Sequence, residues 1–401
     1  MLNVMIWGAG KNCKIVLKAI RRDMCNFIGI VDSNEKLYRS LYMNRWLVVS
    51  PEILRNSQID YIVISVSNNE EILEQCVKMG IEKEKIIDYW NTNEEYCFID
   101  DKEKKVILME RELKKYKRQL QNMPYELGMG ITPIIRPAEE LLEIIINEKK
   151  SLSRFGDGEL EIMQGRERPW FQLPDHKLAE RLMEVFNTRD ERIIIALADN
   201  FGKLDCYTDQ AADGIREYLE HGIREDLMKV IDTKRVYYDT YVTRPYMIYK
   251  NKEHAVRIFQ LFKEVWKERN LLFVEGRQAF IGVRNDLFDG AASIRRIIVP
   301  SKNAFFAYER ILNAVKQNIA DDTLVLISLG PTATVLAYDL AMEGVQAIDI
   351  GQLDNEYDWF LRGVLERIKI PGKCVAEVPG GHEVSAIEDT EYIKQIVAQV
   401  E

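Results

Sequence analysis

Residues 323–341 read TLVLISLGPTATVLAYDLA. The stretch begins with an apolar run, reaches Gly330 and Pro331, and continues with apolar residues at helical spacing. A nearly continuous apolar run is typical of a β-strand that is covered on both faces, and proline is favoured in the first turn of a helix. The stretch therefore predicts a strand, a tight turn and a helix, which is the repeating unit of α/β proteins with a parallel sheet.

Similar runs recur along the second part of the chain. They predict strands at 192–199, 235–242, 271–276, 295–300, 323–330 and 346–351. Several of these runs end in a glycine, a proline or an acidic residue. In open α/β sheets, ligands bind beyond the carboxyl ends of the strands, so the residues that follow these runs are the candidates for function.

The first part of the chain shows the same alternation on a smaller scale. Its apolar runs predict strands at 2–7, 27–32, 61–66 and 85–90. Helical patterns separate the strands, which favours parallel pairing through right-handed crossovers. We therefore predict a small Rossmann-like domain of the nucleotide-binding type at residues 1–98.

The turn after the first strand contains Gly8 and Gly10, and Asp32 ends the second strand. Glycines in such a turn let backbone amides approach a pyrophosphate, and an acid at the end of the second strand is placed to bind a ribose. The third glycine of the dinucleotide-binding pattern is absent, with Cys13 in its place. Cofactor binding by Gly8, Gly10 and Asp32, sugar or nucleotide sensing, and a purely structural role all stay open.

Residues 99–126 are dense in Lys, Glu and Arg and predict a charged helix that joins the first domain to a second at 127–401. Leu113, Tyr116 and Leu120 form a narrow apolar stripe on it. A solvated connector is one interpretation, and a short coiled coil that makes a homodimer is the other.

The composition is that of an ordinary globular protein. The chain has 401 residues, 47% of them hydrophobic and 30% charged, and a formal net charge of -9. The negative charge argues against nucleic acid as a partner, because that affinity depends on clustered Lys and Arg. No stretch approaches the about 20 apolar residues of a transmembrane segment, and no secretion signal is evident. Six scattered cysteines suggest reduced thiols, so we expect a cytoplasmic location.

The heptapeptide RFGDGEL at 154–160 carries Asp157 and Glu159 on either side of a glycine. Two carboxylates at this spacing can converge on one hard cation if the glycine allows a sharp bend. A Mn²⁺ or Mg²⁺ ion carried by a diphosphate needs only one or two protein carboxylates. On spacing alone, a solvated Asp-Gly turn is the competing interpretation.

Other polar residues follow the predicted strands. Thr332 and Thr334 lie next to free backbone amides at the start of a predicted helix, which suits phosphate. Asp354 and Glu356 alternate with aromatic residues after the strand at 346–351, although such alternation is also typical of an exposed edge strand. Four further candidates for substrate binding lie in two loops, with Lys302 as a counter-charge for a diphosphate: Asn285, Asp286, Lys302 and Asn303.

The segments RFGDGEL, GVRNDLF, PSKNAF, LGPTATVLAYDL and AIDIGQLDNEYDWF occur in the order and wording of one family. Residues 127–401 resemble the GT-D-fold glycosyltransferases, bacterial enzymes long described as a domain of unknown function. The resemblance implies a Rossmann-like catalytic domain of the GT-D type there. From this resemblance and the pattern of the first 126 residues, we expect an α/β protein with two Rossmann-like parallel-sheet domains joined by a charged helix. The resemblance also implies metal-dependent transfer of a sugar, typically glucose from UDP-glucose, to a glycan or glycoprotein acceptor in surface polysaccharide or adhesin glycosylation.

In that family the Asp-x-Glu pair serves the metal and the nucleotide sugar, and it matches Asp157 and Glu159 here. Arg154, three residues before Asp157, is a further candidate for substrate binding. A carboxylate would deprotonate the acceptor hydroxyl, with Glu356 as the first candidate and Asp354 and Glu275 as the others.

The chain departs from the family pattern at Phe280, at Arg284, which replaces a glycine, and at Gln352, which replaces a histidine. The donor sugar is therefore less certain than the fold. A non-catalytic nucleotide-sugar-binding module and an NAD-linked oxidoreductase that uses the N-terminal domain are the alternative functions.

Overall fold

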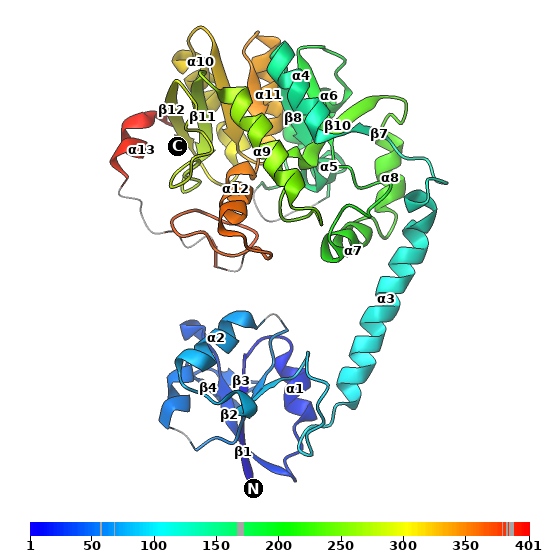
Figure 1. Ribbon diagram of the computed structural model, residues 1–401, viewed down its shortest axis with the longest axis vertical. Coiled ribbons are helices and arrows are strands. Elements are labelled where there is room, and N and C mark those ends of the chain that lie inside the picture. The colour runs from blue at the N-terminus through cyan, green and yellow to red at the C-terminus, as the bar shows by residue number, and fades with distance from the viewer. Residues whose placement is uncertain (57, 68, 167–171, 379, 382–383, 385–388) are drawn as a thin grey trace. The chain divides into compact units, whose positions relative to one another are not determined.

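The chain contains two β-sheets, one in each of two units, and almost all strands within each sheet run parallel (Figure 1). The computed structural model describes residues 1–56, 58–67, 69–166, 172–378, 380–381, 384 and 389–401. Its units are Met1–Lys117 and Arg118–Glu401. The predicted α/β class with two parallel-sheet domains is thereby confirmed.

The first unit contains a six-stranded sheet in the order β3-β4-β2-β1-β5-β6. All neighbouring strands pair in parallel except β3 with β4. The strands are β1 (Leu2–Trp7), β2 (Cys25–Val31), β3 (Leu41–Tyr42), β4 (Trp46–Val49), β5 (Tyr61–Ile64) and β6 (Ile86–Asp88), and the helices are α1 (Cys13–Ala19) and α2 (Glu70–Lys78). The four predicted strands correspond to β1, β2, β5 and β6.

The second unit contains a nine-stranded sheet in the order β15-β12-β11-β13-β14-β8-β9-β10-β7, with every neighbouring pair parallel. Its strands are β7 (Ile134–Arg136), β8 (Ser151–Phe155), β9 (Ile193–Leu197), β10 (Val236–Asp239), β11 (Asn270–Gly276), β12 (Ser293–Val299), β13 (Thr323–Ser328), β14 (Ala347–Asp349) and β15 (Ile396–Gln399). The six predicted strands correspond to β9 to β14. The strands β7, β8 and β15 were not predicted.

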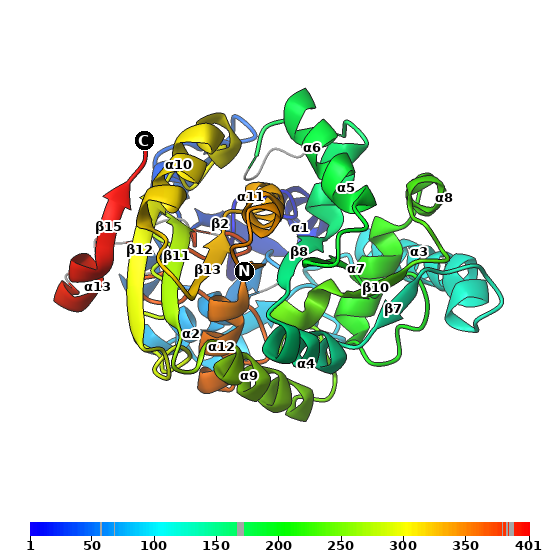
Figure 2. The same cartoon turned by 90° about the horizontal axis from the view of Figure 1, so that it is seen from above.

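Helices cover both faces of this sheet (Figure 2). One face packs against α5 (Asp157–Met163), α6 (His176–Asn187), α7 (Asp209–Tyr218), α8 (Ile223–Val230), α10 (Tyr308–Asn318) and α11 (Pro331–Met342). The other packs against α4 (Ala138–Glu148), α9 (Glu253–Trp266) and α12 (Leu353–Arg362). A short helix, α13 (Thr390–Gln395), precedes the edge strand β15. The central strands are buried on both sides, as continuous apolar runs require.

The charged connector is a single helix, α3 (Lys102–Glu126), which continues through Pro124. The division between the two units falls within it, after Lys117. In its second part, Arg118 lies within 3.4 Å of three carboxylates of the second unit: Asp213, Glu217 and Glu220. The helix is therefore part of both units, whereas we predicted a separate linker at 99–126.

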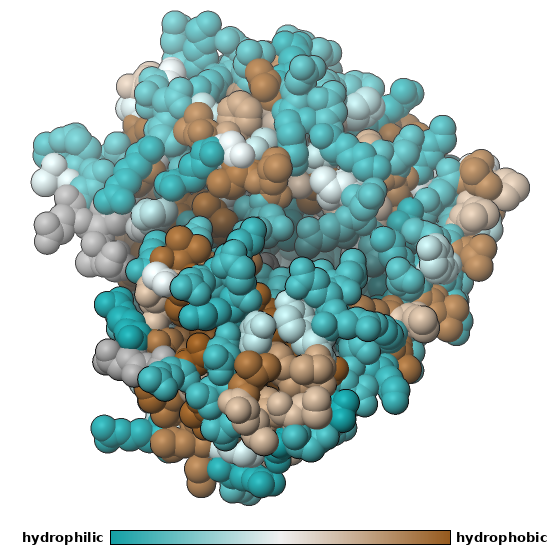
Figure 3. All heavy atoms as spheres, turned by 60° about the horizontal axis from the view of Figure 1, so that its bottom comes forward, coloured by the Kyte–Doolittle hydropathy of each residue, from teal (hydrophilic) through white to brown (hydrophobic). Residues whose placement is uncertain are grey.

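The described surface is largely hydrophilic on the face in Figure 3, with apolar residues in scattered patches. Across the part of the chain that the structure describes, no helix combines the length and the apolar character needed to cross a bilayer.

A buried ion pair joins β11 to β12. The Nη1 atom of Arg296 donates to Oε1 of Glu275 at 2.6 Å, and the two side chains are 4% and 0% exposed. The Arg296 guanidinium also lies over the ring of Tyr392 at 4.6 Å and donates to Gln395 at 2.7 Å. Burial raises the pKa of Glu275, and the charge of Arg296 opposes that shift.

Replacing Arg296 by methionine should lower the free energy of unfolding of the second unit by about 3–5 kcal/mol, because the Glu275 carboxylate then stays buried without its counter-charge. The loss should be smaller at pH 5 than at pH 8. Without Arg296 the pKa of Glu275 rises further, and a neutral carboxyl is tolerated in the core. Urea unfolding at both pH values measures this. Arg295→Met, on the same strand, is the control, and an equal effect of the two substitutions would contradict the prediction.

Candidate functional site

The carboxyl ends of β8, β9, β10, β13 and β14 lie along one edge of the nine-stranded sheet. The helix after β14, α12, packs on the opposite face from α11 after β13 and α5 after β8. Neighbouring strands whose helices diverge in this way mark the place where open α/β sheets bind ligands. We therefore treat the edge around β14 and β8 as the candidate site.

The RFGDGEL segment forms the end of β8 and the first turn of α5. Asp157 is the first residue of the helix and is exposed, and its Oδ1 accepts a hydrogen bond from the Gly158 amide at 3.0 Å. Glu159 turns back, so that its Oε2 accepts from the Gly156 amide at 2.8 Å. This bond caps the helix, because the first backbone amides of a helix lack partners within it. The two acids therefore differ in surroundings: Asp157 is exposed, and Glu159 accepts a hydrogen bond from the backbone.

The carboxyl of Glu159 is partly neutral near pH 7. Burial, followed by the negative charge of Asp349, raises the pKa of Glu159 to about 7. The Gly156 amide and the Arg154 guanidinium act in the opposite direction. Glu159 thus belongs to the group of side chains around β14, not to an isolated surface turn.

Arg154 ties three strand ends together. Its Nη2 lies 2.9 Å from Oδ1 of Asp349, its Nε donates to the Asp349 carbonyl at 2.9 Å, and its Nη1 donates to Oγ1 of Thr243 at 2.8 Å. Gly351 makes room for this guanidinium, because a Cβ atom there would lie 2.1 Å from Nη2, and its φ of 46° also favours glycine. These protein contacts occupy Arg154, for which we predicted a role in substrate binding.

The two threonines of α11 differ in their contacts. The hydroxyl of Thr334 donates to the Arg154 carbonyl at 3.0 Å. The hydroxyl of Thr332, in the first turn and 0% exposed, has no hydrogen-bond partner among the described residues. A buried hydroxyl without a partner is costly, so Thr332 is the threonine with capacity for a ligand.

The three carboxylates that we predicted as catalytic bases are all buried. Oε2 of Glu356 accepts from the amides of Tyr246 and Met247 at 3.0 and 2.9 Å, and the residue is 0% exposed. Glu275 is held by Arg296, as described above. These contacts are those of residues that fix loops, and their catalytic roles stay predictions.

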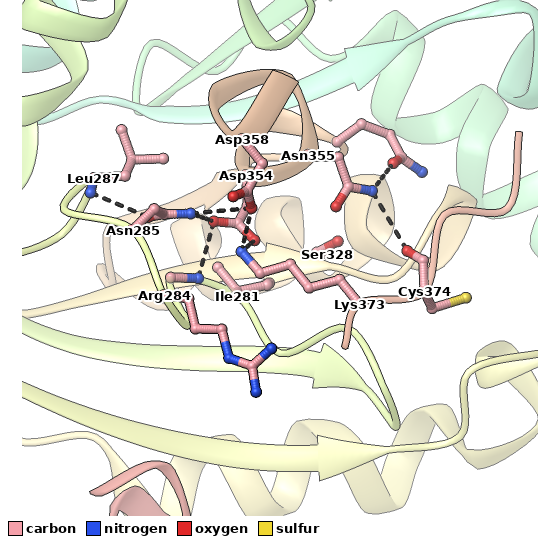
Figure 4. Close-up of polar contacts among 12 residues, drawn as sticks. Ile281, Arg284, Asn285, Leu287, Ser328, Asp354, Asn355, Asp358, Lys373 and Cys374 are labelled. Atoms are coloured by element: carbon pink, nitrogen blue, oxygen red, sulfur yellow. Dashed lines mark hydrogen bonds and ion pairs between the residues drawn. The ribbon is translucent and has the colours of Figure 1, made fainter. Parts of the chain in front are cut away.

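Asp354, the third of them, belongs to a cluster that Figure 4 shows in detail. The Lys373 ammonium lies 2.6 Å from both Asp354 and Asp358, and the Asn285 amide donates to the same two acids at 2.8 and 3.3 Å. Arg284 points away from this cluster, is exposed and has a φ of 65°. Glycine adopts this left-handed backbone conformation more readily than arginine does.

The remaining loop candidates lie at the surface. Asp286 is exposed and contacts Lys263 at 2.8 Å and the Tyr357 hydroxyl at 2.7 Å. Lys302 is exposed, and Asn303 accepts from the Leu173 amide at 2.8 Å. Their roles in substrate binding stay predictions.

Two acids that we did not predict lie at the same edge. Asp239 ends β10, where it accepts from the Tyr241 amide at 2.8 Å and the Tyr249 hydroxyl at 2.9 Å, and Asp199 follows β9. Burial, followed by the charge of Asp239, raises the pKa of Asp199 to about 7. Burial, followed by the charge of Asp157, raises the pKa of Tyr241 well above its ordinary value. Asp199 ends the predicted strand at 192–199, and Asp239 lies near the end of the predicted strand at 235–242. Acidic residues at predicted strand ends were therefore the sequence signal that could have identified both.

In the first unit, the glycine turn is closed by its own acid. Oδ2 of Asp32 accepts from the Ala9 amide at 2.6 Å, and Oδ1 accepts from the Asn34 amide at 2.8 Å. Gly8 has a φ of 107°, and a Cβ atom there would lie 2.7 Å from the Ser65 hydroxyl, whereas Gly10 is exposed. The turn geometry thus accounts for Gly8 and Asp32 without a nucleotide, and cofactor binding stays a prediction.

The residues at β8 fit a divalent cation only in a limited way. Among the described residues, no three or more His, Cys, Asp or Glu side chains lie together in a way that could hold a metal. Asp157 offers one exposed carboxylate, and Glu159 has one oxygen engaged by the helix cap. Such a donor set suits a cation that brings diphosphate oxygens and water, and does not suit a cage made of protein ligands alone.

Residues 152–378 match the family "Glycosyltransferase GT-D fold", and residues 1–87 match "C2185-like, N-terminal". The chain is 39% identical over 263 residues to "Probable glycosyl transferase Gly" of Streptococcus gordonii, which covers 65% of this chain and 38% of that protein. It is 34% identical over 267 residues to "Glycosyltransferase GlyD" of Streptococcus pneumoniae serotype 4, covering 66% and 32%. The matched region therefore spans only about a third of these relatives.

Two solved structures have a similar fold. One, described as a domain of unknown function 1792 with a distinct glycosyltransferase fold, has a TM-score of 0.64 and 34% identity, and covers 72% of this chain and 100% of that one. The other, described as a new glycosyltransferase from Streptococcus sanguinis, has a TM-score of 0.63 and 36% identity, covering 67% and 100%. The chain belongs to the GT-D-fold glycosyltransferase family.

Proposed function

We propose that the second unit transfers a sugar from a UDP-sugar, with UDP-glucose as the first choice, to a glycan or glycoprotein acceptor. The observation that carries the proposal is the exposed Asp157 carboxylate at the start of α5, at the strand edge where the GT-D match begins. Surface polysaccharide or adhesin glycosylation would supply such an acceptor. The cytoplasm is the compartment we propose, in line with the free cysteines.

The donor diphosphate would bind at the first turn of α11. Backbone amides at a helix N-terminus attract anions, and the buried Thr332 hydroxyl has no partner among the described residues. Lys302, which follows β12 and is exposed, could add a positive charge. Thr334 would act indirectly, since its hydroxyl holds the Arg154 carbonyl.

Asp157, with any free oxygen of Glu159, would hold the Mn²⁺ or Mg²⁺ ion of the donor. Bound there, the cation would stabilise the negative charge that develops on the departing diphosphate. Asp157 is exposed, whereas one carboxylate oxygen of Glu159 is engaged by the helix cap.

We propose Asp199 as the base. The residue is exposed and follows β9, the strand next to β8, and its carboxyl group is desolvated enough to raise its pKa. In the transfer, the acceptor oxygen forms a bond to the anomeric carbon, its proton passes to Asp199, and the bond from that carbon to the diphosphate oxygen breaks to release UDP. The pKa of about 7 lets the group take up a proton near neutral pH.

Calorimetry with UDP-sugars, with and without Mn²⁺, followed by assays of donor hydrolysis and transfer, tests the proposed activity. Metal-dependent turnover supports the transferase. Binding without turnover would instead indicate the non-catalytic module, and binding of NAD alone would indicate the oxidoreductase.

Asp157→Asn should lower metal-dependent transfer by about 100-fold or more, because it removes a charged ligand of the cation. Removal of the metal by a chelator should abolish wild-type transfer. Asp209→Asn is the matched control, since Asp209 is the exposed first residue of α7 and its substitution costs the same interaction with a helix dipole. Full activity in Asp157→Asn, at an unchanged melting temperature, would exclude the assignment.

Thr332→Val should weaken binding of the UDP-sugar by roughly 10- to 100-fold, the worth of a hydrogen bond to a charged group. It should not lower the free energy of unfolding, because the lost hydroxyl has no partner in the described protein. Thr334→Val, two residues away, should show the reverse pattern, since it breaks the bond to Arg154. Calorimetry and urea unfolding measure both effects, and unchanged donor affinity in Thr332→Val would refute the phosphate site.

Asp199→Asn should lower kcat by about 10²- to 10⁴-fold without changing donor affinity, because a general base acts on the chemical step. Wild-type kcat should rise with pH through about 7, as Asp199 loses its proton, and the residual activity of the variant should lack this rise. Asp205→Asn changes an exposed acid six positions further along and should leave the profile intact. A pH profile that is the same in Asp199→Asn and the wild type would rule Asp199 out.

A further inference from the structure

The helix α3 carries an apolar stripe that the described chain does not cover. Large apolar residues recur along it at alternating intervals of three and four, from Val106 in the first turns to Leu127 directly after the helix. Their exposed fractions range from 45% to 68%: Val106, Met109, Leu113, Tyr116, Leu120, Met123 and Leu127. This spacing is the a and d pattern of a coiled coil over three heptads.

The opposite side of the same helix is the one that contacts its own chain. In the first unit, the Lys104 ammonium donates to the Thr92 carbonyl at 2.7 Å, and the Arg111 guanidinium lies 5.0 Å from the centre of a ring of Trp90. In the second unit, Arg118 contacts three carboxylates, as described above. Lys104, Arg111 and Arg118 all occupy the f position of the heptad, which faces away from a and d.

The helix therefore differs from an ordinary surface helix, which buries its main apolar stripe. Ile107 and Leu108 pack against the core of the first unit on the same side as the charged anchors, and the longer stripe from Val106 to Leu127 is left exposed. An apolar stripe that runs along a helix and stays exposed to solvent marks an interaction site.

The charges beside the stripe indicate the partner. In a parallel, in-register coiled coil, each g residue lies next to the e residue of the following heptad on the other helix. Lys105 at g would then face Glu110 of a second copy, and Glu112 at g would face Lys117 of that copy. All four residues are exposed in the structure, and the present contacts of Lys105 with Asp101 and Glu95 are exposed ion pairs of low value.

We propose that α3 pairs with α3 of a second copy of this chain as a parallel, in-register two-stranded coiled coil. The seam is the stripe from Val106 to Leu127, and the flanking pairs are Lys105 with Glu110 and Glu112 with Lys117. This inference is independent of the proposed transferase activity, since it uses no residue of the candidate site.

Sedimentation equilibrium of the full chain tests the proposal. The wild type should be a dimer, and Leu113→Glu combined with Leu120→Glu should raise the dissociation constant by about 100-fold or more, because each copy then places two charges in the seam. The matched control is Lys114→Gln combined with Gln121→Glu, which changes the net charge equally at neighbouring exposed positions outside the seam.

Circular dichroism and the melting temperature show whether the seam variant is folded. A wild type that stays monomeric at the highest soluble concentration would overturn the proposal and leave the stripe to a different protein. A dimer that persists in the folded Leu113→Glu, Leu120→Glu variant would overturn it as well.

A single cysteine tests the orientation. Met109→Cys, in a chain in which the exposed Cys97 and Cys206 are replaced by serine, should form a disulfide between copies under mild oxidation, because equal d positions meet only in the parallel, in-register arrangement near the end of the seam. A stable dimer that does not form this cross-link would overturn the parallel arrangement.

Discussion

The guanidinium of Arg154 is the contact on which the second unit's functional edge depends. It connects the ends of β8 and β14 with Thr243 beyond β10, through hydrogen bonds of 2.8 to 2.9 Å. A planar group with five donors can satisfy several acceptors at once, which an ammonium group cannot do in the same geometry. Because Arg154 lies three residues before Asp157, the first residue of α5, its position also fixes where Asp157 and Glu159 lie.

Charge and burial divide the acids of this edge into two kinds. Glu275, Glu356 and Asp354 are buried and engaged by backbone amides or cations, so they hold loops in place. Asp157 and Asp199 lie at the ends of neighbouring strands and remain exposed. Burial of the Asp199 carboxyl group, followed by the charge of Asp239, raises its pKa, so this acid differs from Asp157 in its surroundings.

Most of the fold could be predicted because central parallel strands are apolar on both faces, and β11 and β13 read as continuous apolar runs. The strand β8 could not be recognised in this way, since Ser151 and Ser153 point into the core, where the Ser153 hydroxyl reaches a carbonyl. For the site, the sequence predicted where the strands end, and therefore which loops carry the candidate residues. It did not predict which acids are buried and which are exposed. The alternation from Asp354 to Asp358 belongs to the buried helix α12 and not to a strand edge, because tertiary packing decides between the two.

Gly351 limits the substitutions that this part of the protein can accept during evolution. Any side chain there would collide with Arg154, and its left-handed backbone would be strained as well. Loss of the arginine alone would remove the collision but leave Asp349 buried without its counter-charge. Any single substitution at position 154, 349 or 351 thus gives a less stable protein. We therefore expect the three residues to be retained together once all of them are present.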